Sequence, residues 1–293
     1  MLSSWIAIPG TDAMPLRFAY RTCACALHRL EDALELIAEA DYDGVCLCVD
    51  FPHFDPFADH FEGRARALAM RLETLGLALV IEARQRFLLN PAAPFEPTLI
   101  SAESPGRSTA QRYLARCLKL AALIRAEGVR VASGVVPPGM PPEEARVLLA
   151  ENFETMMAAA RRGRIKVSVM PEAGALIDSV EQWKWLEKAA RGHSLAFDVA
   201  LAHATDEHAP EETICELAPR IGSVTLADSL HGNPEALPPG QGGADLVAVL
   251  AALEEIGFGG LVCVGLSSQS ETAHRAIPET LRMLKSLQRR SDQ

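Results

Sequence analysis

The sequence is short of basic residues, with 28 Lys and Arg against 38 Asp and Glu, which gives a formal net charge of −10. Binding to nucleic acids and to anionic membranes depends on Lys and Arg side chains that neutralise phosphates. We therefore expect no nucleic acid and no membrane among the partners of this protein.

Long apolar runs are also missing. No segment approaches the roughly 18 apolar residues that a membrane-spanning helix requires. The first residues, MLSSWIAIPGTDAMP, lack the basic start and continuous apolar core of a secretory signal. These absences predict a cytoplasmic protein. We expect residues 1–15 to form an N-terminal arm and residues 16–293 to form a single domain.

The seven cysteines lack the spacing of a zinc ribbon or of a small disulfide scaffold, and reduced thiols are the simplest interpretation. A second interpretation comes from Cys23 with Cys25 and Cys46 with Cys48. Each pair is separated by one residue on a predicted strand, so its two side chains would share a face. Together with Cys263 inside a barrel, these thiols would form a cluster for a soft metal.

Eight apolar segments of strand type alternate with helical segments along the chain. This alternation favours a closed (β/α)8 barrel over an open sheet. No GxGxxG or Walker pattern follows any of the segments, which removes the main nucleotide-binding folds. The predicted strands lie within residues 16–24, 43–51, 75–83, 129–134, 165–174, 194–203, 221–228 and 259–266.

Two of these segments carry a carboxylate at the end of an apolar run. Glu172 follows the apolar run in residues 165–174, and Asp198 follows the apolar run in residues 194–203. His203 lies five residues after Asp198. Because the carboxyl ends of the strands in such a barrel meet at one mouth, Glu172 and Asp198 are predicted to converge on one site. They are the first candidates for catalysis.

The third predicted strand ends at Glu82 and is followed by a long Pro-rich loop over residues 86–107. Loops of this length usually form lids or binding loops. Arg86 or Arg107 could hold a phosphate or carboxylate through paired hydrogen bonds, although an internal pair between Glu82 and an arginine is an equal alternative. His53 follows the second strand near the predicted mouth and is a further candidate for substrate binding.

Several segments resemble the xylose isomerase-like TIM barrels. They are VIEARQRFLLNP, MPEAG, FDVALAH, VTLADSLHG and PPGQGGADLVAVLAALEEIGFGGLVCVGL. That superfamily includes sugar and sugar phosphate isomerases and epimerases. The resemblance implies a TIM barrel, a carbohydrate-like substrate, and a divalent metal such as Mn²⁺, Mg²⁺ or Zn²⁺.

The same resemblance implies a ligand set of Glu, Asp, His and Glu after strands five to eight. Glu172 and Asp198 match the first two positions, whereas Thr225 and Gly265 occupy the last two and are not ligands. Each lost ligand removes a direct bond to the ion. We therefore expect a weak or absent metal site, unless His203, Asp228 or His231 substitutes.

Two functions remain open at this point. An isomerase or epimerase would abstract a proton next to a carbonyl, with Glu172 as base or ligand, Asp198 as its partner, and His203 or Asp228 in support. The other function is that of a non-catalytic or repurposed family member that has lost its metal site and acts through a protein partner, such as a second copy of itself or a paralogue. Asp228 could instead cap a loop by accepting backbone N–H groups. The candidate substrate-binding residues are Glu82, Arg86, His53, Arg107 and His231.

Overall fold

Eight parallel strands close into a barrel in the order β1-β10-β7-β6-β5-β4-β3-β2, which confirms the predicted (β/α)8 fold. The computed structural model describes residues 15–51, 53–205 and 208–291, so residues 1–14 of the predicted N-terminal arm lie outside the described residues. The barrel strands are β1 (Arg17–Arg21), β2 (Gly44–Cys48), β3 (Ala78–Ala83), β4 (Val129–Ala132), β5 (Val167–Met170), β6 (Ser194–Asp198), β7 (Ile221–Thr225) and β10 (Leu261–Val264).

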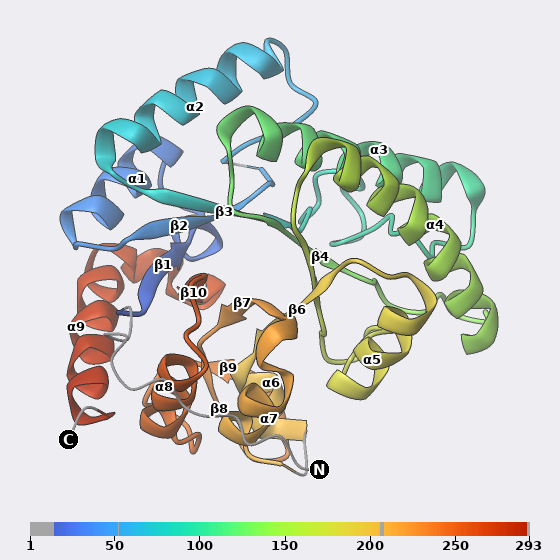
Figure 1. The fold of residues 1–293 in the computed structure, drawn as a ribbon. Coiled ribbons are helices and arrows are strands. Elements are labelled where there is room, and N and C mark those ends of the chain that lie inside the picture. Colours follow the sequence, from blue (N-terminus) through green and yellow to red (C-terminus); the bar gives the residue numbers. More distant parts are fainter. Residues whose placement is uncertain (1–14, 52, 206–207, 292–293) are drawn as a thin grey trace, which may run out of the picture.

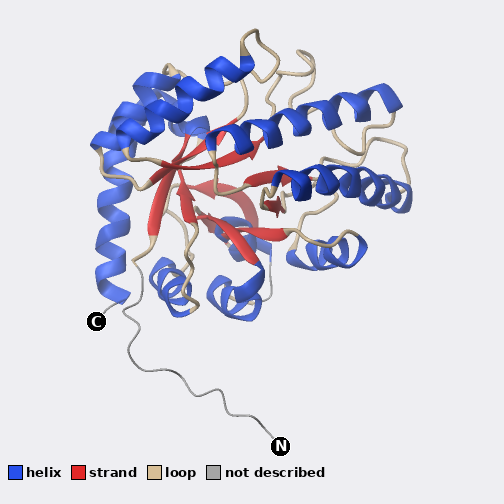
Figure 2. Cartoon of the chain, turned by 45° about the horizontal axis from the view of Figure 1, so that its top comes forward, coloured by secondary structure: helices blue, strands red, loops and turns tan. Residues whose placement is uncertain are grey.

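Helices cover the outside of the barrel (Figures 1 and 2). Their amphipathic sequences explain this arrangement, since Leu34 and Ile37 of the first helix are buried while Glu31 and Glu35 are exposed. None of the helices in the described part of the chain has the length and apolar character needed to cross a membrane. The helices are α1 (Leu30–Glu39), α2 (Phe61–Leu75), α3 (Ser104–Ile124), α4 (Pro142–Gly163), α5 (Val180–Ala189), α6 (Val199–Thr205), α7 (Pro210–Leu217), α8 (Leu246–Glu255) and α9 (Ala273–Ser291).

Four segments near the barrel mouth differ from the sequence prediction. The first strand ends at Arg21, because Thr22–Cys25 form the 3-10 helix η1. The long loop after β3 ends earlier than predicted, since α3 begins at Ser104. Helix α6 follows β6 directly, and an antiparallel hairpin of β8 (Asp228–Leu230) and β9 (Asn233–Leu237) follows β7.

The cysteines are arranged as pairs and not as the cluster considered above. Cys23 lies on η1, and the backbone of Cys48 is hydrogen-bonded to the neighbouring Thr22, while Cys46 packs with Cys263 inside the barrel. All of the cysteines are free thiols. Among the described residues, no group of three or more His, Cys, Asp and Glu side chains is arranged to hold a metal ion. The turn into η1 breaks the strand geometry on which the soft-metal interpretation depended.

Candidate functional site

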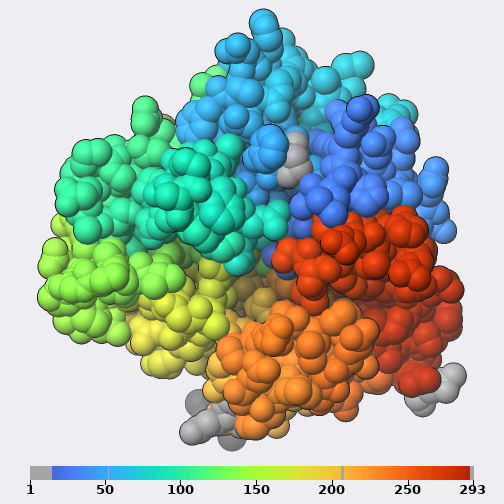
Figure 3. Space-filling view, turned by 180° about the vertical axis from the view of Figure 1, so that it is seen from behind, coloured from blue at the N-terminus to red at the C-terminus, as the bar shows by residue number. Residues whose placement is uncertain are grey.

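A cavity of about 580 Å³ opens at the carboxyl ends of the barrel strands. Its volume lies within the roughly 300–1,000 Å³ typical of small-molecule sites. Figure 3 shows the hollow between the loop after β3, the β8–β9 hairpin and the segment after β10. The side chains with polar or ionisable groups that line it are Arg21, Cys23, Cys48, Arg84, Arg86, Arg130, Glu172, Asp198, Thr225, Glu235, Ser267 and Ser268.

Glu172 follows β5 and faces this cavity. Its Oε1 accepts a hydrogen bond from Nη1 of Arg84 at 2.5 Å, within an ion pair. Burial raises the pKa of the Glu172 carboxyl, although the positive charge of Arg84 opposes this shift. Glu172 is therefore a carboxyl group paired with a cation, and its burial increases the basicity of its ionised form.

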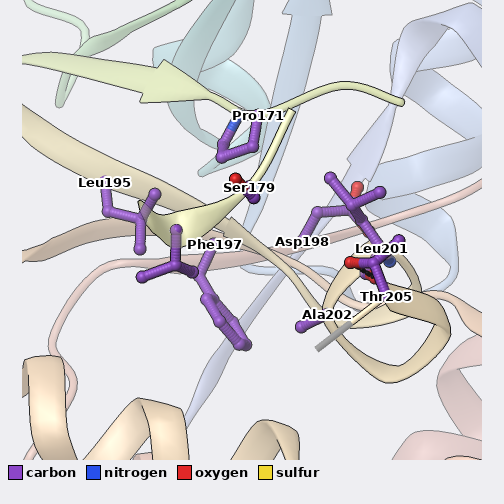
Figure 4. A pocket seen from close by; sticks show the side chains of 9 residues that line it. Pro171, Ser179, Leu195, Phe197, Asp198, Leu201, Ala202 and Thr205 are labelled. Atoms are coloured by element: carbon purple, nitrogen blue, oxygen red, sulfur yellow. Dashed lines mark hydrogen bonds between the residues drawn. The ribbon is translucent and has the colours of Figure 1, made fainter. Parts of the chain in front are cut away.

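Asp198 ends β6 and lines the same cavity, as predicted from the spacing of the strands. Its Oδ1 accepts the backbone N–H of Leu201 at 3.0 Å, which caps the first turn of α6 (Figure 4). Burial raises the pKa of Asp198, against the opposing effects of this hydrogen bond and of Arg21 and Arg130. The structure thus brings together Glu172 and Asp198 from the neighbouring strands β5 and β6.

A second hollow lies behind Asp198, between the segment after β5 and α6 (Figure 4). Its volume is about 10 Å³, close to the minimum for a single water molecule. Pro171, Phe197 and Leu201 give it a mainly apolar wall. It is too small for a substrate, so the larger cavity is the candidate site.

The barrel interior beneath the cavity contains a buried network of two arginines and one carboxylate. Arg21 donates to both carboxylate oxygens of Glu82, at 2.7 and 3.1 Å. Arg130 lies 3.7 Å from the same carboxylate, and its Nη2 donates to Oγ1 of Thr225. Although burial acts in the opposite direction, the two guanidinium groups hold the pKa of Glu82 well below its usual value. Glu82 therefore forms the internal Glu–Arg pair that was one of the two sequence interpretations.

The side chains present do not fit the metal ligand set that the resemblance implies. The hydroxyl of Thr225 accepts the hydrogen bond from Arg130, so a guanidinium group lies where the resemblance implies an imidazole ligand. Gly265 has φ of +105°, and a Cβ there would lie 3.0 Å from Cζ of Tyr20. A carboxylate ligand at that position would thus require both backbone strain and displacement of an aromatic ring.

The three proposed supporting residues do not line the cavity: His203 lies on α6, Asp228 begins β8, and His231 lies in the turn between β8 and β9. His203 is on α6, and its Nδ1 is hydrogen-bonded to Oγ of Ser229 at 2.9 Å. His231 is exposed and contacts the backbone oxygen of His203. Asp228 is buried and accepts the backbone N–H groups of Gly240 and Ala244, both at 3.0 Å. This is the loop-capping role that the sequence offered as the alternative for Asp228.

The fold places the two candidate binding arginines of the predicted loop after β3, Arg86 and Arg107, in different surroundings. Arg86 lines the cavity and donates to Asp50 at 2.9 Å. Arg107 instead donates to the backbone oxygens of Ser101 and Ala102, so it holds the loop together. The same loop contributes Phe95 to the cavity wall, where the guanidinium of Arg84 lies 4.6 Å from the ring centre.

His53 is buried, and its Nε2 is hydrogen-bonded to the backbone oxygen of Cys25 at 3.2 Å. Burial lowers the pKa of His53. The side chain does not line the cavity, because it lies against the backbone that follows β1.

The sequence reasoning did not find three of the four cavity arginines, which are Arg21, Arg84 and Arg130. A signal was present for Arg130, because a charged residue between two valines in a short apolar strand requires an internal partner. Arg21 and Arg84 carry no such signal, since each directly follows or ends an apolar run as surface residues often do.

Comparisons with known proteins agree with this architecture. Residues 34–287 match the model of the family described as xylose isomerase-like TIM barrel. No curated protein matches the chain in sequence.

Several solved structures are similar in fold. A 3-keto-D-glucoside 4-epimerase from E. coli has a TM-score of 0.74 and 14% identity, covering 92% of this chain and 99% of that chain. A D-psicose 3-epimerase from Clostridium cellulolyticum H10, solved with D-tagatose, has a TM-score of 0.73 and 12% identity, covering 93% and 99%. The IOLI protein, solved with a zinc atom, has a TM-score of 0.71 and 16% identity, covering 93% and 96%.

At such low sequence identities, the similarity shows a shared fold and does not show a shared activity. The family match, in contrast, extends over most of the chain and includes Glu172 and Asp198. The chain therefore belongs to the xylose isomerase-like TIM barrel family.

Proposed function

We propose that this protein is an isomerase or epimerase that moves a proton next to the carbonyl group of a polyhydroxylated keto compound. The observation that carries the proposal is that Glu172 and Asp198, at the ends of neighbouring strands, line one cavity of ligand size. Structural relatives whose names describe epimerases of keto sugars support the substrate class.

Glu172 is the proposed general base. Its ion pair with Arg84 favours the ionised form, which can accept a proton, and its burial raises the pKa of the carboxyl. A carbon-bound proton next to the carbonyl would move to a carboxylate oxygen of Glu172, while the electron pair of the C–H bond moves toward the carbonyl oxygen. General bases of this kind contribute about 10²–10⁴-fold to a rate.

Asp198 is the proposed acid that returns a proton. Burial raises the pKa of its carboxyl, which favours the protonated form more than in a solvated aspartate. Two carboxyl groups with different partners, one paired with Arg84 and one capping α6, can hold different protonation states at one pH. This difference is what a two-carboxyl proton transfer requires.

Negative charge that develops on the carbonyl oxygen needs a positive partner. The described residues do not fit the family's metal ligand set, so the proposal assigns this charge stabilisation to arginine. Arg130 and Arg84 both line the cavity that Glu172 and Asp198 share. A fixed cationic donor at a developing oxyanion contributes about 10²–10³-fold in comparable sites.

The charge of the cavity wall limits which substrates the site can bind. Four arginines and three carboxylates line it, so the positive and negative charges nearly balance, and Arg84 and Arg86 are each paired with a carboxylate. A neutral keto sugar and one with a single carboxylate or phosphate both agree with this balance. Of the two, an anionic group would gain a paired hydrogen bond from Arg86 or Arg84.

Deuterium exchange tests the proposal directly. Ketoses, ketose phosphates and inososes are incubated with the protein in D₂O, and NMR follows loss of the proton next to the carbonyl. We expect exchange with at least one compound, and its loss in Glu172→Gln. Glu181→Gln is the matched control, because it makes the same chemical change at an exposed position of α5 outside the cavity. Exchange that survives Glu172→Gln would contradict the assignment of the base.

A specific observation also favours the second candidate function, binding of a protein partner. Large apolar side chains are exposed in the loops that follow β1 to β4, and two of them, Phe95 and Val135, also line the cavity. Exposed apolar surface can mark a protein interface. These residues are Leu27, Phe51, Phe57, Phe87, Phe95 and Val135. Sedimentation analysis of the wild type and of Phe51→Ser would test for self-association, which the substitution should weaken.

A further inference from the structure

The thiols of Cys23 and Cys48 line the wall of the mouth cavity, and the proposed proton transfer uses neither of them. Cys23 lies on η1, directly after β1, and Cys48 ends β2, the strand that pairs with β1. The backbone N–H of Cys48 donates to Oγ1 of Thr22 at 3.0 Å, which holds the two segments together.

A disulfide requires Cα separations of roughly 4.4–6.8 Å, so the two backbone segments must lie side by side. The hydrogen bond from the backbone of Cys48 to Thr22, the residue before Cys23, brings the two segments into direct contact, and both thiols line the same cavity. The two side chains also shift each other's pKa, as neighbouring groups do.

The surroundings of Cys23 favour its thiolate. The hydrogen bond from Cys48 lowers the pKa of Cys23 to about 6, with further lowering by Arg21 and Arg86, against the opposing effects of burial and Glu82. The thiolate is the reactive form toward peroxides and electrophiles. Although Cys23 is only 6% exposed, its side chain lines an open cavity through which a small reagent can enter.

We propose that Cys23 and Cys48 form a redox-active thiol pair at the barrel mouth, in which Cys23 is the modified nucleophile and Cys48 the resolving thiol. The co-reactant is a small peroxide, for which hydrogen peroxide is the probe. This site is independent of the proton transfer proposed above.

The chemistry balances in two steps. The Cys23 thiolate attacks one peroxide oxygen, the O–O bond breaks, and the departing hydroxide takes up a proton to leave as water, giving a sulfenic acid. The thiol of Cys48 then attacks the Cys23 sulfur, the S–O bond breaks, and a second water leaves as the disulfide forms. Two thiols are oxidised and one peroxide is reduced to two waters.

The second thiol pair in the barrel provides an internal control. Cys46 on β2 and Cys263 on β10 lie together in a small apolar cluster in the barrel interior. Neither residue lines the cavity, and both are fully buried. We therefore expect a small peroxide to oxidise the Cys23–Cys48 pair and to leave the Cys46–Cys263 pair reduced.

Peptide mass spectrometry tests the proposal on the folded full-length protein. The variant Cys215→Ser removes the exposed thiol that could join two molecules. It is treated with hydrogen peroxide, and free thiols are then alkylated under denaturing conditions. We expect a Cys23–Cys48 cross-linked peptide that has lost two hydrogen atoms, formed at least about tenfold faster than any oxidation of Cys46 or Cys263.

Two variants separate the steps. Cys48→Ser keeps a hydrogen-bond donor beside Cys23, so Cys23 should still be oxidised, and its sulfenic acid should be trapped by a 1,3-dione. Cys23→Ser should abolish the cross-link and leave Cys48 reduced. The proposal is overturned if Cys23 in the folded wild type stays unmodified under conditions that oxidise Cys215. It is equally overturned if Cys23 and Cys46 react at the same rate.

Discussion

Arg130 donates a hydrogen bond from Nη2 to Oγ1 of Thr225 and so joins β4 to β7 across the interior of the barrel. Thr225 occupies the position at which the family resemblance implies a histidine ligand. The cationic group next to the candidate site is therefore a guanidinium, held by a hydroxyl on one side and by Glu82 on the other. This arrangement leads to predictions for activity, stability and metal dependence.

Replacement of Arg130 should reduce proton exchange without loss of the fold. In Arg130→Met the guanidinium is lost, while the carboxylate of Glu82 keeps its hydrogen bonds with Arg21. We expect the exchange rate to fall by about 10²–10³-fold, as for removal of an oxyanion donor. Deuterium exchange by NMR measures the rate, and circular dichroism checks the fold. An unchanged rate in a folded Arg130→Met would show that Arg130 has only a structural role.

Two substitutions separate the roles of Asp198 as proton donor and as cap of α6. Asp198→Asn keeps an acceptor for the N–H of Leu201 but removes the exchangeable carboxyl proton. We expect product formation to fall by about 10²-fold or more, with little change in melting temperature. Asp198→Ala should lose activity and also about 1 kcal/mol of stability, because the cap of α6 is removed. If Asp198→Asn remained fully active, Asp198 would be a cap alone.

Glu82→Gln should destabilise the protein strongly. The substitution leaves Arg21 and Arg130 in the barrel interior without their shared carboxylate. Breaking a buried ion pair in this way costs about 3–5 kcal/mol. Urea unfolding measures the difference from the wild type, and the exposed Glu181→Gln should change stability by less than about 0.5 kcal/mol.

The contribution of Glu82 should also depend on pH. Its pKa in the folded protein lies below the usual value of 4.5, so folding favours the ionised form. The contribution is therefore fully present above pH 4.5 and is lost as the pH falls toward the folded-state value. The stability gap between the wild type and Glu82→Gln should therefore shrink as the pH falls from about 5 to about 3. A stability difference that grows as the pH falls would contradict the expected direction of this pH dependence.

Asp228 should act on stability and not on chemistry. Its carboxylate accepts the N–H groups of Gly240 and Ala244, and a Cβ at Gly242 would lie only 2.3 Å from its Oδ1. Asp228→Ala leaves these donors without their acceptor, which should cost about 1–3 kcal/mol. Thermal unfolding measures the loss. With substrate at saturation below the melting temperature, the exchange rate should stay within about twofold of the wild type.

Chelation should leave the protein unchanged. Because Thr225 is engaged by Arg130 and Gly265 lacks space for a carboxylate, we expect no family-type binding of Mn²⁺ or Zn²⁺. A ligand present at 100 times its Kd would stabilise the fold by about 2.7 kcal/mol. The melting temperature should therefore be equal with EDTA and with Mn²⁺. A rise with Mn²⁺ that disappears in Glu172→Ala would instead reveal a rebuilt metal site.

Much of the architecture follows from local patterns in the sequence. Eight apolar runs separated by amphipathic segments specify a barrel, because each strand and helix can bury its apolar face only in such an arrangement. The meeting of Glu172 and Asp198 at one cavity follows from the same rule, since all parallel strands end at one mouth. Neither inference depends on contacts between distant residues.

The rest of the site depends on contacts that only barrel closure creates. Arg130 meets Thr225 because β4 and β7 face each other across the interior, over a sequence separation of 95 residues. His203 is directed away from the cavity because α6 begins immediately after β6, and Asp228 is occupied by a loop that returns from Gly240. The sequence by itself determined the strands and the two carboxylates at their ends. Only the tertiary structure decided which charges share the barrel interior, because those pairings depend on long-range closure and not on local periodicity.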